Sequence, residues 1–89
     1  MITAAQMRAA RALLGIDQAR LADLAGLSLP TIQRMEASDG IVRGQVDTLM
    51  RVTEALERAG IALIGDEATS NGGGRGVRLR QPENATPES

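Results

Sequence analysis

The chain lacks the side chains on which most enzyme chemistry depends. Among its 89 residues there is no Cys and no His, which removes thiolate chemistry, disulfides, the commonest metal ligand and the usual general base. The glycine run 72–74 is not followed by the Lys-Ser/Thr pair that a phosphate-binding loop requires. No nucleophile stands beside a base, and no paired carboxylates occur. We therefore expect no enzyme activity, no cofactor and no metal site.

The chemistry that remains is that of arginine. Every one of the ten basic residues is Arg, and Arg can hold phosphate or guanine through two parallel hydrogen bonds, although a GC-rich codon bias also explains the lack of Lys. The formal net charge of −1 by itself argues against nucleic-acid binding. The distribution of charge favours it, because the first half of the chain contains Arg8, Arg11, Arg20, Arg34 and Arg43.

The sequence shows no targeting or membrane segment. No basic stretch leads into an apolar one near Met1, and no apolar run is long enough to cross a bilayer. We therefore expect a cytoplasmic protein without membrane contacts.

Four helices are predicted from capping residues and helical periodicity. Thr3 and Gln6 form a capping-box pattern, Asp17 and Ser28 can each cap a further helix, and Pro30 fits the first turn of the third. Glycines mark helix ends at Gly15 and Gly26. The expected helices cover residues 4–14, about 18–25, from 28 to about 37, and 45–59, with a loop at 41–44.

After residue 60 the periodicity changes to that of short strands. Residues 61–64 and 77–80 are expected to pair as a hairpin across the glycine-rich segment 65–76, and the polar residues 81–89 are expected to form a disordered tail. The predicted fold is mainly α, with a four-helix domain at 1–60 and a two-stranded β-hairpin at 61–80.

The second and third predicted helices form a helix-turn-helix. Small Ala22 allows the two helices to cross closely, Gly26 can take the positive φ of the turn, and Ile32 packs beneath the second helix of the pair. In the third helix, Leu29, Pro30, Gln33 and Arg34 then point away from the core face. These four are the candidate base-contacting residues, unless they form an ordinary solvated face.

These residues resemble a known family. Gln18, Leu21-Ala22, Gly26-Leu27-Ser28, Thr31-Ile32 and Glu36 are similar to the xenobiotic-response-element (XRE) regulators, which include Cro and the phage repressors. The resemblance covers residues 1 to about 59, and the following segment resembles a small subgroup in which a hairpin replaces the fifth helix. It implies a four-helix helix-turn-helix domain of the phage-repressor type. It also implies a DNA-binding regulator in which Gln18 contacts phosphate or base, and in which Leu29, Thr31, Gln33 and Arg34 face the groove.

The resemblance also implies a salt bridge between Arg11 and Glu36 that joins the first and third helices. We therefore assign Arg11 a structural role, with phosphate binding as the alternative. The candidate phosphate contacts lie at helix starts, which favour anions, and in the loop after the third helix. They are Gln18, Ser28, Thr31 and Arg43.

The hairpin is the expected dimer interface. Its apolar residues suit a buried surface, and an isolated hairpin is barely stable; alternatively the hairpin folds onto its own fourth helix. The expected interface residues are Ile61, Leu63, Ile64, Val77 and Leu79. The resulting hypothesis is a repressor that binds an inverted repeat in double-stranded DNA as a homodimer. The alternative is an antitoxin or anti-regulator module that binds a toxin or second regulatory protein.

Overall fold

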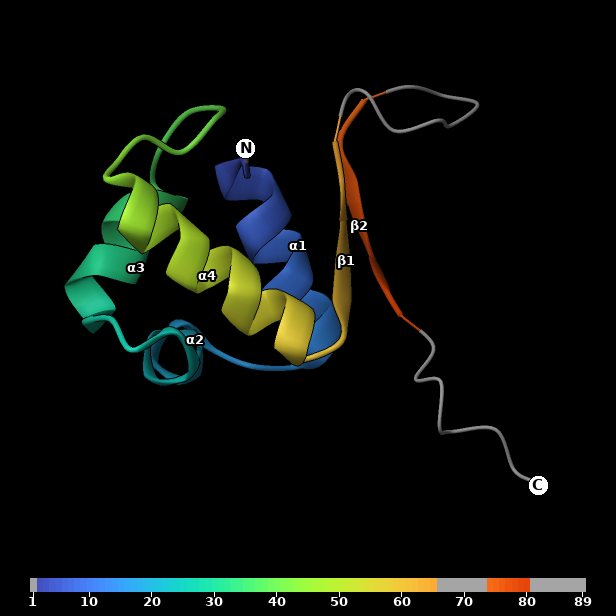
Figure 1. Cartoon of the computed structure of the whole chain (residues 1–89), viewed down its shortest axis with the longest axis horizontal. Helices are drawn as coiled ribbons and strands as arrows, with labels where there is room; N and C mark the ends of the chain where they lie inside the picture. The colour runs from blue at the N-terminus through green and yellow to red at the C-terminus, as the bar shows by residue number, and fades with distance from the viewer. Residues whose placement is uncertain (1, 66–73, 81–89) are drawn as a thin grey trace.

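The chain folds as four helices followed by a two-stranded antiparallel sheet in the computed structural model, which describes residues 2–65 and 74–80 (Figure 1). The predicted fold class is therefore confirmed. The predicted disordered tail, and most of the segment joining the strands, lie outside the described residues. The elements are α1 (Ala4–Leu14), α2 (Gln18–Ala25), α3 (Leu29–Glu36), α4 (Val46–Arg58), β1 (Ile61–Ile64) and β2 (Gly76–Leu79).

Local side-chain hydrogen bonds begin the first three helices. The Thr3 hydroxyl accepts from the Gln6 backbone N–H at 3.1 Å, and the Thr3 backbone N–H donates to Gln6 Oε1 at 2.9 Å. Asp17 accepts from the Arg20 N–H at 2.8 Å, and Ser28 caps α3, which has Pro30 in its first turn. These bonds satisfy N–H groups that have no partner within the helix.

The turn between α2 and α3 is set by Gly26. Its φ of 69° lies in the left-handed region, and the N–H of Leu27 donates to the Ala22 carbonyl at 2.9 Å, which closes the end of α2. This geometry leaves only three residues between α2 and α3, as a helix-turn-helix requires.

The core is aliphatic, because the chain contains no aromatic residue. Met7, Leu21, Ile32 and Leu56 bring one fully buried side chain from each helix. The hairpin adds Ile61, which is also fully buried. We predicted Ile61 as an interface residue, but its side chain has no surface to offer a partner.

The hairpin lies against its own chain, with β2 beside α1 and β1 beside α4 (Figure 1). The strand β2 begins and ends one residue earlier than predicted, so that Ile61 pairs with Leu79 and Leu63 with Val77. The buried amide of Gln6 on α1 donates to the carbonyl oxygens of Ile64 and Gly76, at 3.0 Å each. One side chain therefore holds both strands to the helical domain.

The predicted loop 41–44 contains an unpredicted contact with the N-terminus. Thr3 and Ile41 form an antiparallel bridge, and the Val42 N–H donates to the Ile2 carbonyl at 3.0 Å. Ile2 and Val42 are both buried, so this contact fixes the loop that connects α3 to α4. None of the helices in the described parts of the chain has the length and apolar character needed to span a bilayer.

Replacing Gly26 by Ala should lower the free energy of unfolding by about 1 to 2 kcal/mol, because an L side chain disfavours the left-handed backbone. Space is not the obstacle, since an added Cβ would meet only the Arg51 guanidinium at 3.5 Å. Gly44→Ala is the matched control, because Gly44 lies outside the left-handed region and faces open space. Urea denaturation of both variants measures the difference. Equal stabilities would contradict the role assigned to Gly26.

Candidate nucleic-acid interface

The exposed face of α3 carries the predicted base-contacting residues. Leu29, Pro30, Gln33 and Arg34 are all exposed, whereas Ile32 and Met35 on the opposite face are buried. No acidic residue lies on this exposed face, because the helix's one carboxylate, Glu36, is buried. The face therefore offers a guanidinium, an amide and an apolar side chain without local negative charge.

The buried carboxylate of Glu36 holds α3 against α1. Arg11 donates to it through two atoms, Nε to Oε2 at 2.7 Å and Nη2 to Oε1 at 2.8 Å, and the Glu36 side chain is only 3% exposed. The hydrogen bond to Glu36 raises the pKa of Arg11, although partial burial opposes the rise. Arg8 adds a bond from Nη1 to the Glu36 carbonyl oxygen at 2.6 Å. Two side chains of α1 thus anchor the C-terminal end of α3.

Gln18, a predicted phosphate contact, also belongs to this network. Its Nε2 donates to Glu36 Oε1 at 3.0 Å, so the first residue of α2 is tied to the last residue of α3. A primary amide carries two N–H groups. Gln18 can therefore hold Glu36 with one of them and donate the other to an external acceptor.

Ser28 and Thr31, two more predicted phosphate contacts, are hydrogen-bonded to each other at the start of α3. Their hydroxyl oxygens are 2.8 Å apart, and the Ser28 hydroxyl also accepts from the Thr31 N–H at 3.3 Å. Ser28 is exposed and Thr31 is half-buried. Both residues therefore shape the beginning of α3, and a hydroxyl at its surface remains accessible.

A polar cleft lies between α3 and the start of α4. It has a volume of about 430 Å³, and Arg34 and Arg43 both contribute to its lining. Gln45, the N-cap residue of α4, makes no capping hydrogen bond with its side chain. The first N–H groups of α4 therefore favour an anion at this position. The other polar residues lining the cleft are Thr31, Ser38, Gln45 and Thr48.

Gln45 and Thr48 were not among the predicted site residues. The available signal was the predicted start of a helix near Gln45, since a helix start favours anions. Their proximity to Arg34 depends on how the loop after α3 folds, and that path is set by the contact of Ile2 with Val42.

The cleft and the exposed face of α3 carry side chains that can bind a ligand through hydrogen bonds. Within residues 2–65 and 74–80, no group of three or more potential metal-ligating side chains occurs. Guanidinium, amide and hydroxyl groups of this kind hydrogen-bond phosphates and base edges.

Comparison with known proteins agrees with this geometry. The helix-turn-helix family model matches residues 7–58, which is more than half of the chain and extends from α1 to the end of α4. No curated protein matches the chain.

Replacing Arg11 by Met should lower the free energy of unfolding by about 2 to 3 kcal/mol, because it leaves the Glu36 carboxylate buried without a cation. The matched control is Arg20→Met. Arg20 pairs with Asp23 at 3.2 Å, but both side chains are mostly exposed, so its loss should cost less than about 0.5 kcal/mol. Urea denaturation compares the two. Similar losses would mean that the Glu36 network does not stabilise the fold.

Proposed function

Because the chain belongs to the helix-turn-helix family of Cro- and C1-type XRE regulators, a family of DNA-binding regulators, we propose that it is a repressor that binds an inverted-repeat operator as a homodimer, in the cytoplasm. The observation that carries this proposal is the acid-free exposed face of α3, held in place by the buried Glu36. A helix presented in this way fits the major groove of B-DNA.

Three of the four exposed side chains of α3 each suit a particular base. Arg34 can donate two hydrogen bonds to guanine, and Gln33 can pair with the donor and acceptor of adenine. Leu29 offers only apolar contact, which suits a thymine methyl group. Pro30 lies beside it in the first turn and adds apolar surface without a donor.

The phosphate contacts lie on both sides of α3. Arg43 and the first N–H groups of α4 face one side, and we add Gln45 and Thr48 of the cleft to this set. Gln18 at the start of α2 supplies the other side with its second amide N–H. Ser28 and Thr31 contribute hydroxyl groups at the start of α3. These contacts would fix the orientation of α3 without reading sequence.

The small size of one recognition helix supports the proposed homodimer. Specific DNA binding buries on the order of 1,000 Å² or more, which one small module hardly reaches, and twofold duplication is the common solution. Of the predicted interface residues, those with accessible surface are Leu63, Ile64, Val77 and Leu79, and we retain them in the proposed interface.

The net charge of −1 favours a second candidate, a module that uses this fold to bind a toxin or another regulator. The two candidates differ in how they depend on α3. A protein-binding module would bind its partner equally well with Arg34 removed, whereas the repressor would bind its operator more weakly.

We expect selection from random duplexes to yield a palindromic site whose affinity falls steeply as salt rises. Each phosphate neutralised by Arg releases counterions, which gives a slope of log K against log salt of about −0.9 per contact. Titrations at several salt concentrations measure it. A flat response would contradict DNA binding through Arg and phosphate.

Arg34→Ala should weaken binding to the selected site by about 1 to 3 kcal/mol and relax the preference at one base position. Arg43→Ala should weaken binding to selected and scrambled duplexes equally, because phosphate contacts carry no sequence information. Titrating both variants on both duplexes separates the two roles. If Arg34→Ala causes equal losses on every duplex, Arg34 is a phosphate contact.

A further inference from the structure

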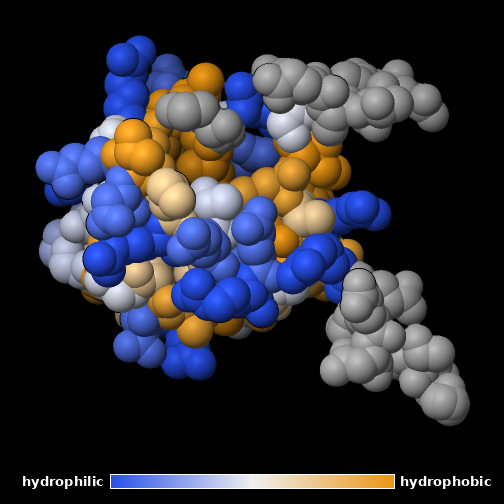
Figure 2. All heavy atoms as spheres, viewed as in Figure 1, coloured by the Kyte–Doolittle hydropathy of each residue, from blue (hydrophilic) through white to orange (hydrophobic). Residues whose placement is uncertain are grey.

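The helix α4 has an apolar face that its own chain leaves uncovered. Val52 and Leu56 on its inner side are buried, whereas Val46 is 71% exposed and Met50 is 52% exposed. Figure 2 shows apolar surface along the edge of α4 that faces the N-terminal segment, above the hydrophilic side chains on the outer side of the helix. Soluble monomers rarely leave such patches without a function.

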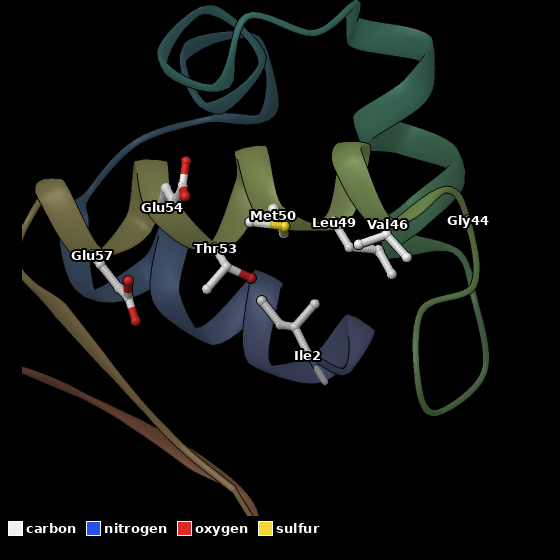
Figure 3. A pocket seen from close by; sticks show the side chains of 8 residues that line it. All are labelled: Ile2, Gly44, Val46, Leu49, Met50, Thr53, Glu54 and Glu57. Carbon is white, nitrogen blue, oxygen red and sulfur yellow. The ribbon is translucent and has the colours of Figure 1, made fainter.

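These exposed side chains line a groove of about 420 Å³ between α4 and the N-terminal segment. Figure 3 shows Ile2 on one side of this groove, across from Leu49, Met50 and Thr53 of α4. We name this surface the α4 groove. Its lining residues are Ile2, Gly44, Val46, Leu49, Met50, Thr53, Glu54 and Glu57.

The α4 groove is acidic at one end and lies beside a basic residue at the other. Glu54 and Glu57 lie at the C-terminal end of α4, while the exposed Arg43 lies next to Gly44 at the other end. Arg43 and Glu57 are equally far from Met50 along the chain, on opposite sides of it. Two antiparallel α4 helices crossing at Met50 would bring the Glu57 end of each copy toward the N-terminal end of the other, next to the loop that bears Arg43.

We propose that the α4 groove is the centre of the interface between two copies of this chain, with the α4 helices packed antiparallel about a twofold axis near Met50. This inference rests on the proposed homodimer and names the surface that forms it. A twofold contact must be self-complementary, and apolar side chains flanked by opposite charges meet that requirement. The acidic residues disfavour the other common use of an exposed apolar face, which is adsorption to anionic lipid.

The α4 groove continues toward the hairpin, which extends the available area. A second hollow shares Ile2, Thr53 and Glu57 with the groove and reaches Leu63 and Gly65. A stable interface buries about 800 Å² and about 20 residues on each partner, which is more than the eight groove residues provide. The hairpin thus lies at the rim of the same interface rather than at its centre.

This interface is compatible with DNA binding. The α4 groove shares only Gly44 and Leu49 with the polar cleft beside α3, and none of the exposed α3 residues lines it. A second copy in the groove therefore leaves the α3 face accessible. Arg43 lines the cleft as well, and its guanidinium has five N–H donors, so that it can pair with Glu57 of the second copy and still donate to a phosphate.

The test is Met50→Glu in the full-length chain, measured by sedimentation without DNA. A carboxylate near the twofold axis would face its own copy and would be desolvated, so the dimer dissociation constant should rise about tenfold or more. Leu13→Glu is the matched control, because Leu13 on α1 is 44% exposed and lies outside the groove. It should leave the constant unchanged. Thermal melts of both variants verify folding, which exposed positions should tolerate.

Leu79→Glu tests the hairpin in the same assay and should have a smaller effect than Met50→Glu. If Leu79→Glu is monomeric and Met50→Glu dimerises as tightly as the wild type, the α4 groove is not the centre of the interface and the proposal is overturned. The proposed homodimer itself would stand. A wild-type chain that is monomeric at all concentrations, or that binds another protein in this groove, would also overturn it. Loss of palindrome binding by Met50→Glu, with half-site binding retained, would support it. Failure of the wild type to bind any duplex would count against the proposed function alone, because sedimentation requires no DNA.

Discussion

The position of α3 depends on one buried carboxylate. A charged group removed from water must be paired and hydrogen-bonded, and Glu36 meets this requirement through Arg11 of α1 and Gln18 of α2. The carbonyl of the same residue is bonded by Arg8. Three helices are thereby oriented around a single side chain. The surface offered by Gln33 and Arg34 depends on this arrangement, because a rotation of α3 would change which side chains face outward.

The second constraint is the small volume of the core. Without aromatic residues, four short helices bury little apolar surface, and a short chain has little surface to bury. Segments outside the helices complete the core, since Ile2, Val42 and Ile61 are all buried. This explains why the hairpin packs on its own chain. It also explains why the loop before α4, which bears Arg43, has a fixed path.

The helices could be predicted because their signals are local. Thr3, Asp17 and Ser28 each bond a backbone N–H three residues ahead, and Gly26 ends α2 through its own φ. Contacts between distant residues could not be predicted in this way. Gln6 bonds carbonyl groups 58 and 70 residues away, and the bridge of Thr3 with Ile41 depends on the completed fold. For the same reason, the periodicity of residues 46–58 predicted the helix α4 but not that Val46 and Met50 would stay exposed on it.

The placement of charged side chains explains how a chain with a net charge of −1 can bind DNA, which is a polyanion. In the described part of the chain, Arg20 pairs with Asp23, Arg51 with Asp47 and Arg11 with Glu36, so these acids contribute little field at α3. Arg34 and Arg43 line the cleft between α3 and α4, where no carboxylate joins them. Glu54 and Glu57 line the α4 groove instead, and neither of them lines the cleft. DNA therefore encounters the local field of α3 and the cleft rather than the net charge of the whole chain.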